Sequence, residues 1–497
     1  METIVLDGNS LTTDQIINVG DNKASVAISQ QSKQKIITTW GTVQKAILEL
    51  KIIYGITTMF GSDKDQILTK EQIQAFNQIV LVQHATSLCS KVQNDSKIKK
   101  ITRAAWTILL NGFAHGKSSI RLELFEEILS KINKDIVPYQ NIEINASVGS
   151  ADLIPLSQMA LHLLSNTFKL DAGEALALMS SNAVSIARAV YAIRSARDFL
   201  ANATLSVAFS YEGLRANPSP FSTTVSNSSA NPFKKTVSES LRNLMHGSAL
   251  LEDGTAIGIQ AFLSLRNVTE ILGCLLEALD HAEQCLLHDI NAHQGNPVID
   301  QDVFVSTSNY DTTRVTNAVQ SVIHAIGTVV QTSEGRAGKQ YDRKFSGLAS
   351  GLCGGLGQVS QLDGIYTRNL PYWLCAFVRE ALNKVNSATF INRFASGCSI
   401  AEGVEDYNSP LPHVVCILEE LLPIAQKVVC MEALFAVCAL ERRNMSKDIS
   451  KQMFDAYSAF SLASPFRLKH DEQYSLEDAM NLYLIRDKNL KINPLLS

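Results

Sequence analysis

Apolar residues recur at three- and four-residue spacing along most of this chain. The clearest stripe consists of Val315, Ala318, Val319, Val322, Ile323, Ile326, Val329 and Val330. An α-helix has 3.6 residues per turn, so these side chains share one face of a helix of about five turns. The stripe predicts a long helix with one buried face.

Six further long segments carry the same periodicity. They cover residues 71–93, 156–170, 175–200, 264–290, 370–384 and 411–441. Each is long enough to cross a whole domain as a helix. The pattern therefore predicts a mainly α protein built from long helices.

Segments rich in glycine, proline or small polar residues separate the predicted helices. Residues 54–61 are bounded by glycine, 145–155 are rich in small residues, 217–233 are rich in Pro, Ser and Asn, and 346–357 contain five glycines. Because loops on a rigid frame often carry active-site groups, we expect functional side chains in these segments.

The overall charge argues against a polyanionic partner. The 497 residues include 44 Lys+Arg and 48 Asp+Glu, for a formal net charge of −4. Nucleic-acid binders need clustered basic side chains to displace counterions from phosphate, so no nucleic acid is expected as a partner. The nine cysteines are scattered and lack the paired spacing of a zinc site. We expect reduced thiols and no metal.

Neither a secretory signal nor a membrane span is expected. The amino terminus lacks a basic start followed by a continuous apolar stretch, and the most apolar later segment, 414–440, is interrupted by four charged residues. Together with the cysteine pattern, this predicts a cytoplasmic protein.

One short segment carries a family resemblance. Residues 145–156 read N-A-S-V-G-S-A-D-L-I-P-L. They resemble G-S-V-G-A-S-G-D-L-x-P-L, the signature of the aromatic amino acid ammonia-lyases and aminomutases, which include the histidine, tyrosine and phenylalanine lyases. Without gaps, the family's Ala-Ser-Gly tripeptide falls on Gly149, Ser150 and Ala151. Aligning Ser147-Val148-Gly149 with the family's S-V-G would delete one residue of the tripeptide, and we prefer the ungapped version.

Further motifs follow in the family's order across nearly the whole chain. They are residues 54–61 (similar to Y-G-[IV]-[NT]-T-x-F-G), 84–85 (S-H-A), 211–221 (E-A-L-x-G), 260–266 (Q-D-x-Y-S-L-R), 296–297 (D-N-P) and 404–409 (Q-E-D-H-V-S). The resemblance implies an ammonia-lyase-like fold. In that fold, a smaller amino-terminal region, 1–205, would carry the loops, and 206–497 would form a long antiparallel helical bundle.

The resemblance also implies a self-made electrophile. Elimination of ammonia is difficult because the β-proton is weakly acidic and ammonium is a poor leaving group. In the family the tripeptide cyclises and dehydrates into a methylidene-imidazolone (MIO), which captures the substrate amine. Here Ala151 nitrogen would attack the Gly149 carbonyl carbon, and Ser150 would lose its hydroxyl. A left-handed conformation at Ala151 would cost about 1–2 kcal/mol relative to glycine.

The resemblance assigns catalytic roles to three further residues. Tyr54 matches the base, and its phenol, with an ordinary pKa of about 10, would need to become more acidic. Arg266 matches the residue that grips the substrate carboxylate with a planar fork. Glu405 matches a carboxylate that handles the amino group or a proton. The alternatives are a tyrosine that packs a turn, a surface salt bridge and a charge at a helix amino terminus.

The remaining predicted site residues surround the substrate and the tripeptide. Gln260 and Ser180 would lie beside the cofactor, with Ser180-Ser181 replacing the family's Asn-Gly and Asn182 displaced by two places. Leu263 replaces a tyrosine, and Tyr310 keeps an aromatic ring. His84 matches a histidine found in the tyrosine- and histidine-specific enzymes, which favours a polar aromatic substrate.

Three functions are compatible with these departures from the family pattern. The first is an ammonia-lyase or aminomutase that acts on a tyrosine- or histidine-like α-amino acid through MIO. The second is an MIO-less homologue that performs a different elimination, addition or cyclisation. The third is a non-catalytic helical scaffold. The resemblance further implies a homotetramer in which several subunits build each active site.

Overall fold

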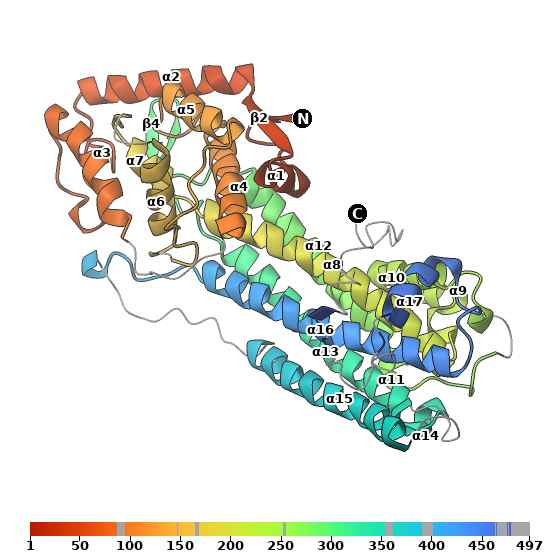
Figure 1. The fold of residues 1–497 in the computed structure, drawn as a ribbon. Helices are drawn as coiled ribbons and strands as arrows, with labels where there is room; N and C mark the ends of the chain where they lie inside the picture. The colour runs from red at the N-terminus through yellow and green to blue at the C-terminus, as the bar shows by residue number, and fades with distance from the viewer. Residues whose placement is uncertain are drawn as a thin grey trace. The chain divides into compact units, whose positions relative to one another are not determined.

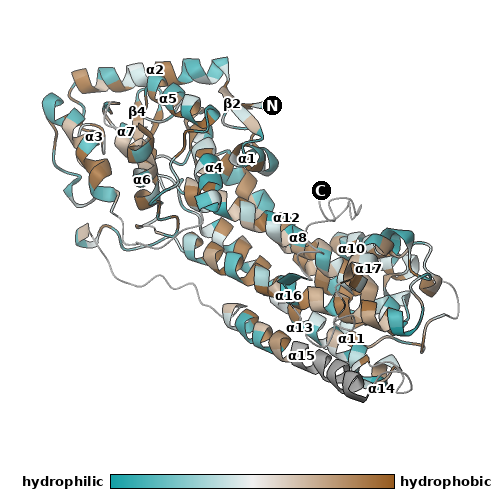
Figure 2. Ribbon diagram, viewed as in Figure 1, coloured by the Kyte–Doolittle hydropathy of each residue, from teal (hydrophilic) through white to brown (hydrophobic). Residues whose placement is uncertain are grey.

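Helices account for most of the chain in the computed structural model (Figure 1). The structure describes residues 1–86, 95–146, 148–164, 168–251, 255–352, 361–389 and 401–462, together with the single residues 464, 475, 477 and 478. The mainly α fold expected from the periodicity is confirmed. Figure 2 shows how hydrophobic and polar residues are distributed along the helices.

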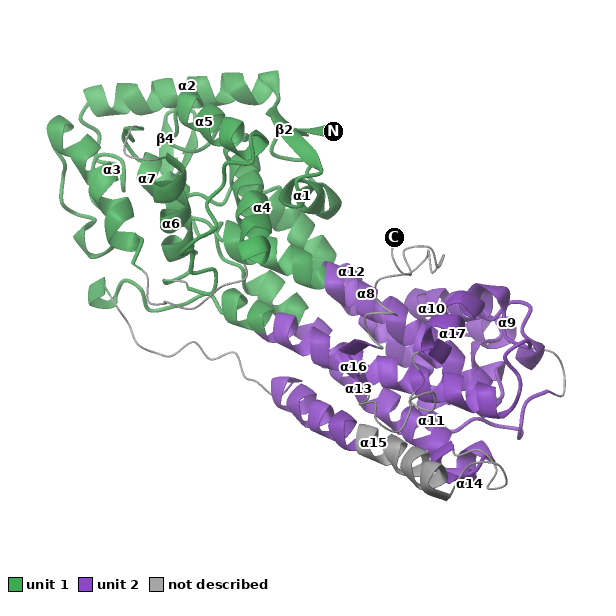
Figure 3. Ribbon diagram, in the orientation of Figure 1, with its two compact units in different colours: residues 1–193, 281–319, 392–416 green, residues 194–280, 320–391, 417–497 purple. Residues whose placement is uncertain are grey.

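The chain packs into two compact units, each made of three segments (Figure 3). Unit 1 comprises Met1–Ile193, His281–Val319 and Asn392–Cys416, and unit 2 comprises Arg194–Asp280, Gln320–Ile391 and Ile417–Ser497. Both units are discontinuous because long helices contribute residues to each of them. The expected division into domains at residues 205 and 206 remains a prediction.

Unit 1 contains the amino-terminal helices and both pairs of described strands. Its helices are α1 (Thr13–Gly20), α2 (Gln30–Leu48), α3 (Lys70–His84), α4 (Asp95–Phe113), α5 (Leu122–Asn133), α6 (Leu153–Leu164) and α7 (Glu174–Met179). Strands β1 (Glu2–Leu6) and β2 (Ala24–Ile28) are parallel, and β3 (Val298–Asp300) and β4 (Val303–Val305) are antiparallel. A buried apolar cluster that includes Val43, Ile56 and Ile299 packs α2 against the loop that follows it.

Four long helices of the described chain contribute to both units. They are α8 (Ala183–Leu214), α12 (Val268–Ile290), α13 (Thr313–Tyr341) and α16 (Leu411–Arg442). Unit 2 also contains α9 (Thr223–Asn227), α10 (Pro232–Leu244), α11 (Leu263–Arg266), α14 (Arg343–Ser346), α15 (Gln361–Thr389) and α17 (Lys451–Leu462). Within unit 2, Arg336 forms a buried bidentate ion pair with Glu432, with N–O distances of 2.6 and 2.9 Å.

Most predicted helices are present, although some of their boundaries differ from the prediction. The stripe at 315–330 lies in α13, 411–441 lies in α16, and 370–384 lies in α15. The predicted helix 175–200 is wrong in one respect, because it is broken between α7 and α8. There Ser181 Oγ donates to Gln294 Oε1, and the Asn182 side chain bonds to backbone carbonyls, so side chains compete with helical hydrogen bonding.

Three other helix predictions need correction at their ends or interiors. The predicted helix 264–290 is interrupted at Asn267, which ends α11. The helix predicted over 71–93 ends at His84, and residues 87–93 lie outside the described part of the chain. The one predicted over 156–170 runs instead from Leu153 to Leu164, with Leu156 N–H donating to the Asp152 carbonyl at its start, and residues 165–167 lie outside the described part of the chain.

Among the described residues, two helical stretches are long and apolar enough to cross a membrane. They are Glu174–Leu214 and Leu411–Arg442, whose most apolar windows are 94% and 83% buried within the protein. This degree of burial is characteristic of core helices, so length and composition alone are weak evidence for a membrane span.

Candidate active site

A pocket of about 480 Å³ in unit 1 collects most of the residues singled out by the sequence. Its lining includes Tyr54, His84, Ser150, Ala151, Ser180, Tyr310 and Glu405. The volume lies within the ordinary range for small-molecule sites. Gln260, Leu263 and Arg266 belong to unit 2, and Leu263 is 59% exposed. Their assignment to the site remains a prediction.

A tight turn presents the tripeptide to this pocket. Val148 and Ala151 exchange backbone hydrogen bonds, with N–O distances of 3.3 and 3.4 Å. Gly149 adopts a left-handed conformation with φ of 58°, whereas Ala151 does not have a positive φ. The left-handed position is therefore the first residue of the tripeptide, and the penalty considered for Ala151 does not arise in this turn.

Two donors from other segments bind the carbonyls of the turn. Ser409 N–H donates to the Gly149 carbonyl over 2.9 Å. The Asn182 side-chain nitrogen donates to the Ser150 carbonyl over 2.6 Å and also to the Tyr310 carbonyl. Although Asn182 is displaced by two places from the family's asparagine, the break between α7 and α8 brings its amide to the turn. Sequence comparison identified the displacement but not this contact.

Asp152, which directly follows the tripeptide, is held by hydrogen bonds from the start of α8. Ser185 donates to its carboxylate through the backbone nitrogen at 2.7 Å and the hydroxyl at 2.6 Å. Complete burial raises the pKa of Asp152 to about 6, even though these hydrogen bonds and the charge of Arg188 lower it. Asp152 lies within the signature, but the sequence offered no sign of its burial.

The environment of Tyr54 does not make its phenol more acidic. Gly61 N–H donates to the phenol oxygen over 3.3 Å, which lowers the pKa. Burial is the largest influence and raises the pKa of Tyr54, and the charge of Glu405 and the Tyr310 phenol raise it further. The net result is a pKa above the ordinary value, opposite to the requirement placed on a base near neutrality.

The pocket concentrates acidic groups. Burial raises the pKa of Glu405, Asp406 raises it further, and His84 lowers it. Burial also raises the pKa of the Tyr310 phenol, and the charges of Glu405 and Asp311 add to this effect. Such surroundings favour a cationic group, such as a protonated amine, near Glu405. Across the described residues, no group of three or more His, Cys, Asp and Glu side chains is arranged to hold a metal ion.

His84 lines the pocket and is oriented by a backbone carbonyl. Its Nδ1 lies 2.8 Å from the Val80 carbonyl oxygen. A carbonyl only accepts hydrogen bonds, so we assign a proton to Nδ1, and Nε2 then accepts a hydrogen bond in the neutral ring and donates one in the cationic ring. The Phe60 ring lies beside it, with ring centroids 5.8 Å apart. In its neutral form, His84 therefore suits a ligand with a ring N–H or O–H donor.

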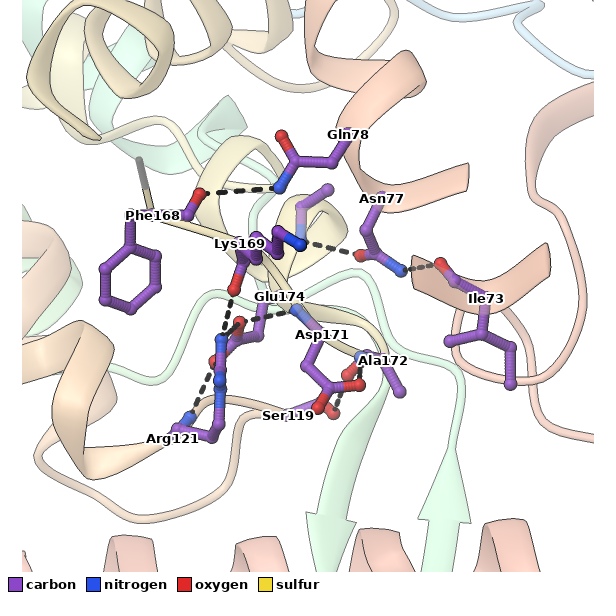
Figure 4. Close-up of polar contacts among 11 residues, drawn as sticks. Ile73, Asn77, Gln78, Ser119, Arg121, Phe168, Lys169, Asp171, Ala172 and Glu174 are labelled. Atoms are coloured by element: carbon purple, nitrogen blue, oxygen red, sulfur yellow. Dashed lines mark hydrogen bonds and ion pairs between the residues drawn. The ribbon is translucent and has the colours of Figure 1, made fainter. Parts of the chain in front are cut away.

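An ion pair with a fully buried carboxylate holds the start of α7 (Figure 4). Glu174 is fully buried and accepts hydrogen bonds from the backbone and side chain of Arg121 and from Asp171 N–H. Farther along α7, the Leu176 side chain packs closely on Gly55. A Cβ built on Gly55 would lie 2.2 Å from Leu176 Cδ2. The ion pair thus anchors the helix that supports the loop carrying Tyr54.

Comparisons with known proteins agree with the residue pattern. The model of the aromatic amino acid lyase family matches residues 11–168 and 165–461. A histidine ammonia-lyase of Caldanaerobacter subterraneus subsp. tengcongensis is 27% identical over 361 residues, covering 68% of this chain and 70% of that protein.

Solved structures share the fold over nearly the whole chain. The ergothioneine-degrading enzyme ergothionase from Treponema denticola has a TM-score of 0.83 at 20% identity, covering 99% of this chain and 100% of that one. Pantoea agglomerans phenylalanine aminomutase has a TM-score of 0.84 at 17% identity, covering 97% and 98%. At identities of 20% and 17%, these structural similarities show the fold alone. The family match, in contrast, is a match of the sequence and covers most of the chain. The chain belongs to the aromatic amino acid lyase family.

Proposed function

We propose that this protein is a carbon–nitrogen lyase or aminomutase that acts on a polar aromatic α-amino acid, of the histidine or tyrosine kind, through MIO formed from Gly149, Ser150 and Ala151. The observation that carries the proposal is the turn at these residues. It opens into a pocket shared with Tyr54, His84 and Glu405, and its first carbonyl accepts a hydrogen bond.

The residues of the turn fit the formation of this group. Ala151 nitrogen forms a bond to the Gly149 carbonyl carbon, and the carbonyl oxygen leaves as water with the amide protons of Ala151 and Ser150. The Ser150 hydroxyl leaves as a second water with the Ser150 α-proton. The left-handed Gly149 supports a tight turn before closure. Once formed, the group would supply an electrophile for the substrate amine.

The side chains of the pocket would then bind and orient the substrate. The Glu405 carboxylate would hold the amino group, and His84 Nε2 would accept a hydrogen bond from a ring N–H or O–H. A positive charge bound near Glu405 would lower the pKa of the Tyr54 phenol and oppose the shift seen in the free site. Tyr54 would then remove the β-proton.

We further propose that the active enzyme is a cytoplasmic homotetramer in which neighbouring subunits complete each site. In that assembly Arg266 would grip the substrate carboxylate, with Gln260 and Leu263 nearby. Exposure of Gln260 and Leu263 on unit 2 supports this proposal, because a surface that completes a neighbour's site must be accessible before assembly.

A second candidate is an elimination that does not use MIO. The Glu405 carboxylate occupies the space that an alanine methyl group would need at position 149, where the family has alanine. The tripeptide surroundings therefore differ from the family pattern at the first reacting residue. Such an enzyme would require a substrate with a better leaving group than ammonium. Tyr54 and Glu405 would remain the groups that handle protons and charge.

The mass of the peptide that contains Ser150 distinguishes these functions. MIO would make this peptide lighter by two water molecules, whereas an unmodified mass would favour the second candidate. Release of ammonia from histidine or tyrosine, abolished by Tyr54→Phe, would support the lyase. For a non-catalytic scaffold, Arg266→Ala would leave every assayed binding and turnover property unchanged while the oligomer remained intact.

A further inference from the structure

The segment that carries Glu405 is docked onto the start of α13 by two neighbouring threonines. Thr312 Oγ1 lies 2.7 Å from Ser409 Oγ, and Thr313 Oγ1 lies 2.8 Å from the Tyr407 hydroxyl. Thr312 is 1% exposed and Ser409 is 7% exposed, so water competes little for their mutual hydrogen bond. This attachment places Ser409 N–H against the Gly149 carbonyl.

Arg188 stabilises the same arrangement from inside unit 1. Its side chain is fully buried, and its Nη1 donates to the Ile144 carbonyl at 3.0 Å and to the Pro412 carbonyl at 3.3 Å. Ile144 precedes the tripeptide turn, and Pro412 follows Ser409 in the docked segment. A single guanidinium therefore joins the two segments on either side of the hydrogen bond between Ser409 and Gly149.

The location of this hydrogen bond has a chemical consequence. When Ala151 nitrogen attacks the Gly149 carbonyl carbon, negative charge develops on the carbonyl oxygen. A donor fixed 2.9 Å from that oxygen stabilises the charge without rearranging at the moment of reaction. Asn182 binds the next carbonyl, that of Ser150, so it cannot replace Ser409 in this role.

We infer that Ser409 N–H activates the Gly149 carbonyl during formation of the cofactor, and that Thr312 is the positioning residue that holds this donor in place. The inference rests on the proposed MIO function and deepens it. It assigns a role to a hydroxyl that lies outside the tripeptide and outside the substrate pocket lining. Ring closure and the loss of both waters follow the atom balance given above.

The test follows the maturation of the full chain without requiring a known substrate. The wild type, Thr312→Val and Thr312→Ser are made by cell-free synthesis, and the mass of the peptide containing Ser150 is measured over time. Thr312→Val keeps the side-chain shape but removes the hydroxyl, and we expect the doubly dehydrated peptide to accumulate about tenfold or more slowly. Thr312→Ser keeps the hydroxyl and should mature at the wild-type rate.

Two further variants separate positioning from loss of stability. Thr107→Val removes a buried hydroxyl that donates to the Arg103 carbonyl of its own helix, and it should mature normally. Ser409→Ala removes the other side of the Thr312 hydrogen bond. Ser409 Oγ also accepts from Leu411 N–H at 3.4 Å, so Ser409→Ala should slow maturation at least as much as Thr312→Val. Adding Thr312→Val to Ser409→Ala should slow maturation no further, because their mutual hydrogen bond is already lost.

Each failure has a distinct signature. Equal maturation rates for the wild type, Thr312→Val and Ser409→Ala would overturn the role of Thr312 but leave MIO formation standing. An unmodified wild-type peptide would overturn both this inference and the proposed cofactor. If Thr312→Val does not fold, as judged by its thermal unfolding, the smaller change Ser409→Ala decides the outcome.

Discussion

The carboxylate of Glu405 lies directly against the backbone of Gly149. A Cβ built on Gly149 would be 1.8 Å from Glu405 Oε2 and 2.7 Å from its Cδ, well inside any real contact between such atoms. Gly149 also has a φ of 58°, a conformation that residues with a side chain seldom adopt. The position of Glu405 therefore depends on the absence of a side chain at residue 149.

We predict that Gly149→Ala destabilises the protein and displaces Glu405, although it restores the residue type found in the family. The backbone conformation alone should cost about 1–2 kcal/mol, and the contact with Glu405 should add to this cost. Gly347→Ala is the matched control, because Gly347 has a φ of 69° and open space where its Cβ would lie. Free energies of unfolding from urea titration measure both changes. Equal losses in the two variants would show that Glu405 moves aside without cost.

The raised pKa of Tyr54 predicts a rate that increases with pH. A phenol acts as a base only when ionised, so kcat/KM should rise through the alkaline range, with an apparent pKa above the ordinary value of about 10. Tyr54→Phe should remove this limb of the profile. Because the charge of Glu405 raises the pKa of Tyr54, Glu405→Gln should move the limb to lower pH even as it slows the reaction. A limb that stays in place would show that Glu405 does not govern this ionisation.

His84 provides a test of ring recognition. With Nδ1 bonded to the Val80 carbonyl, Nε2 can accept from a substrate ring but cannot donate while neutral. We predict that His84→Leu lowers kcat/KM for histidine or tyrosine about 10- to 100-fold, the effect of leaving one ring donor unpaired, and affects phenylalanine less. Parallel assays with the three amino acids measure the ratio. An equal loss for all three would assign His84 a packing role only.

The fold was predictable because helical periodicity persists over long segments. The stripe in 315–330 and the apolar run over 411–441 both correspond to observed helices. The break at residues 180–182 was not predictable from periodicity, because the hydrogen bonds of Ser181 and Asn182 that replace helical ones go to distant segments. Tertiary contacts of this kind override local propensity.

The candidate site was predictable only in part, for a related reason. Motif order placed Tyr54, His84 and Glu405 together, and they do line one pocket. Ser409 ends the 404–409 motif, but the group that it directs at the Gly149 carbonyl is a backbone N–H, and a motif does not report where that N–H points. The pKa of Tyr54 likewise depends on burial and neighbouring charge, which a motif does not report.

The Arg121–Glu174 ion pair should contribute substantially to stability because its carboxylate is fully buried (Figure 4). Glu174 Oε1 accepts from the backbone N–H and Nε of Arg121, and Oε2 accepts from Arg121 Nη2 and Asp171 N–H. In Glu174→Gln, one of these oxygens becomes an NH₂ group that faces donors. We predict a loss of about 3 kcal/mol in the free energy of unfolding, measured by urea titration.

A surface ion pair in the same unit supplies the control for this prediction. Lys33 Nζ lies 2.7 Å from Glu126 Oε1, but the two side chains are 33% and 46% exposed. Glu126→Gln should therefore lower the free energy of unfolding by less than about 1 kcal/mol. Arg121→Met combined with Glu174→Gln should cost less than the sum of the single changes, because no buried charge is then left without its partner. If Glu174→Gln costs no more than Glu126→Gln, the buried pair does not anchor α7. Support for the Tyr54 loop must then come from its apolar packing, which includes Leu176 on Gly55 and Ile56 in the buried cluster.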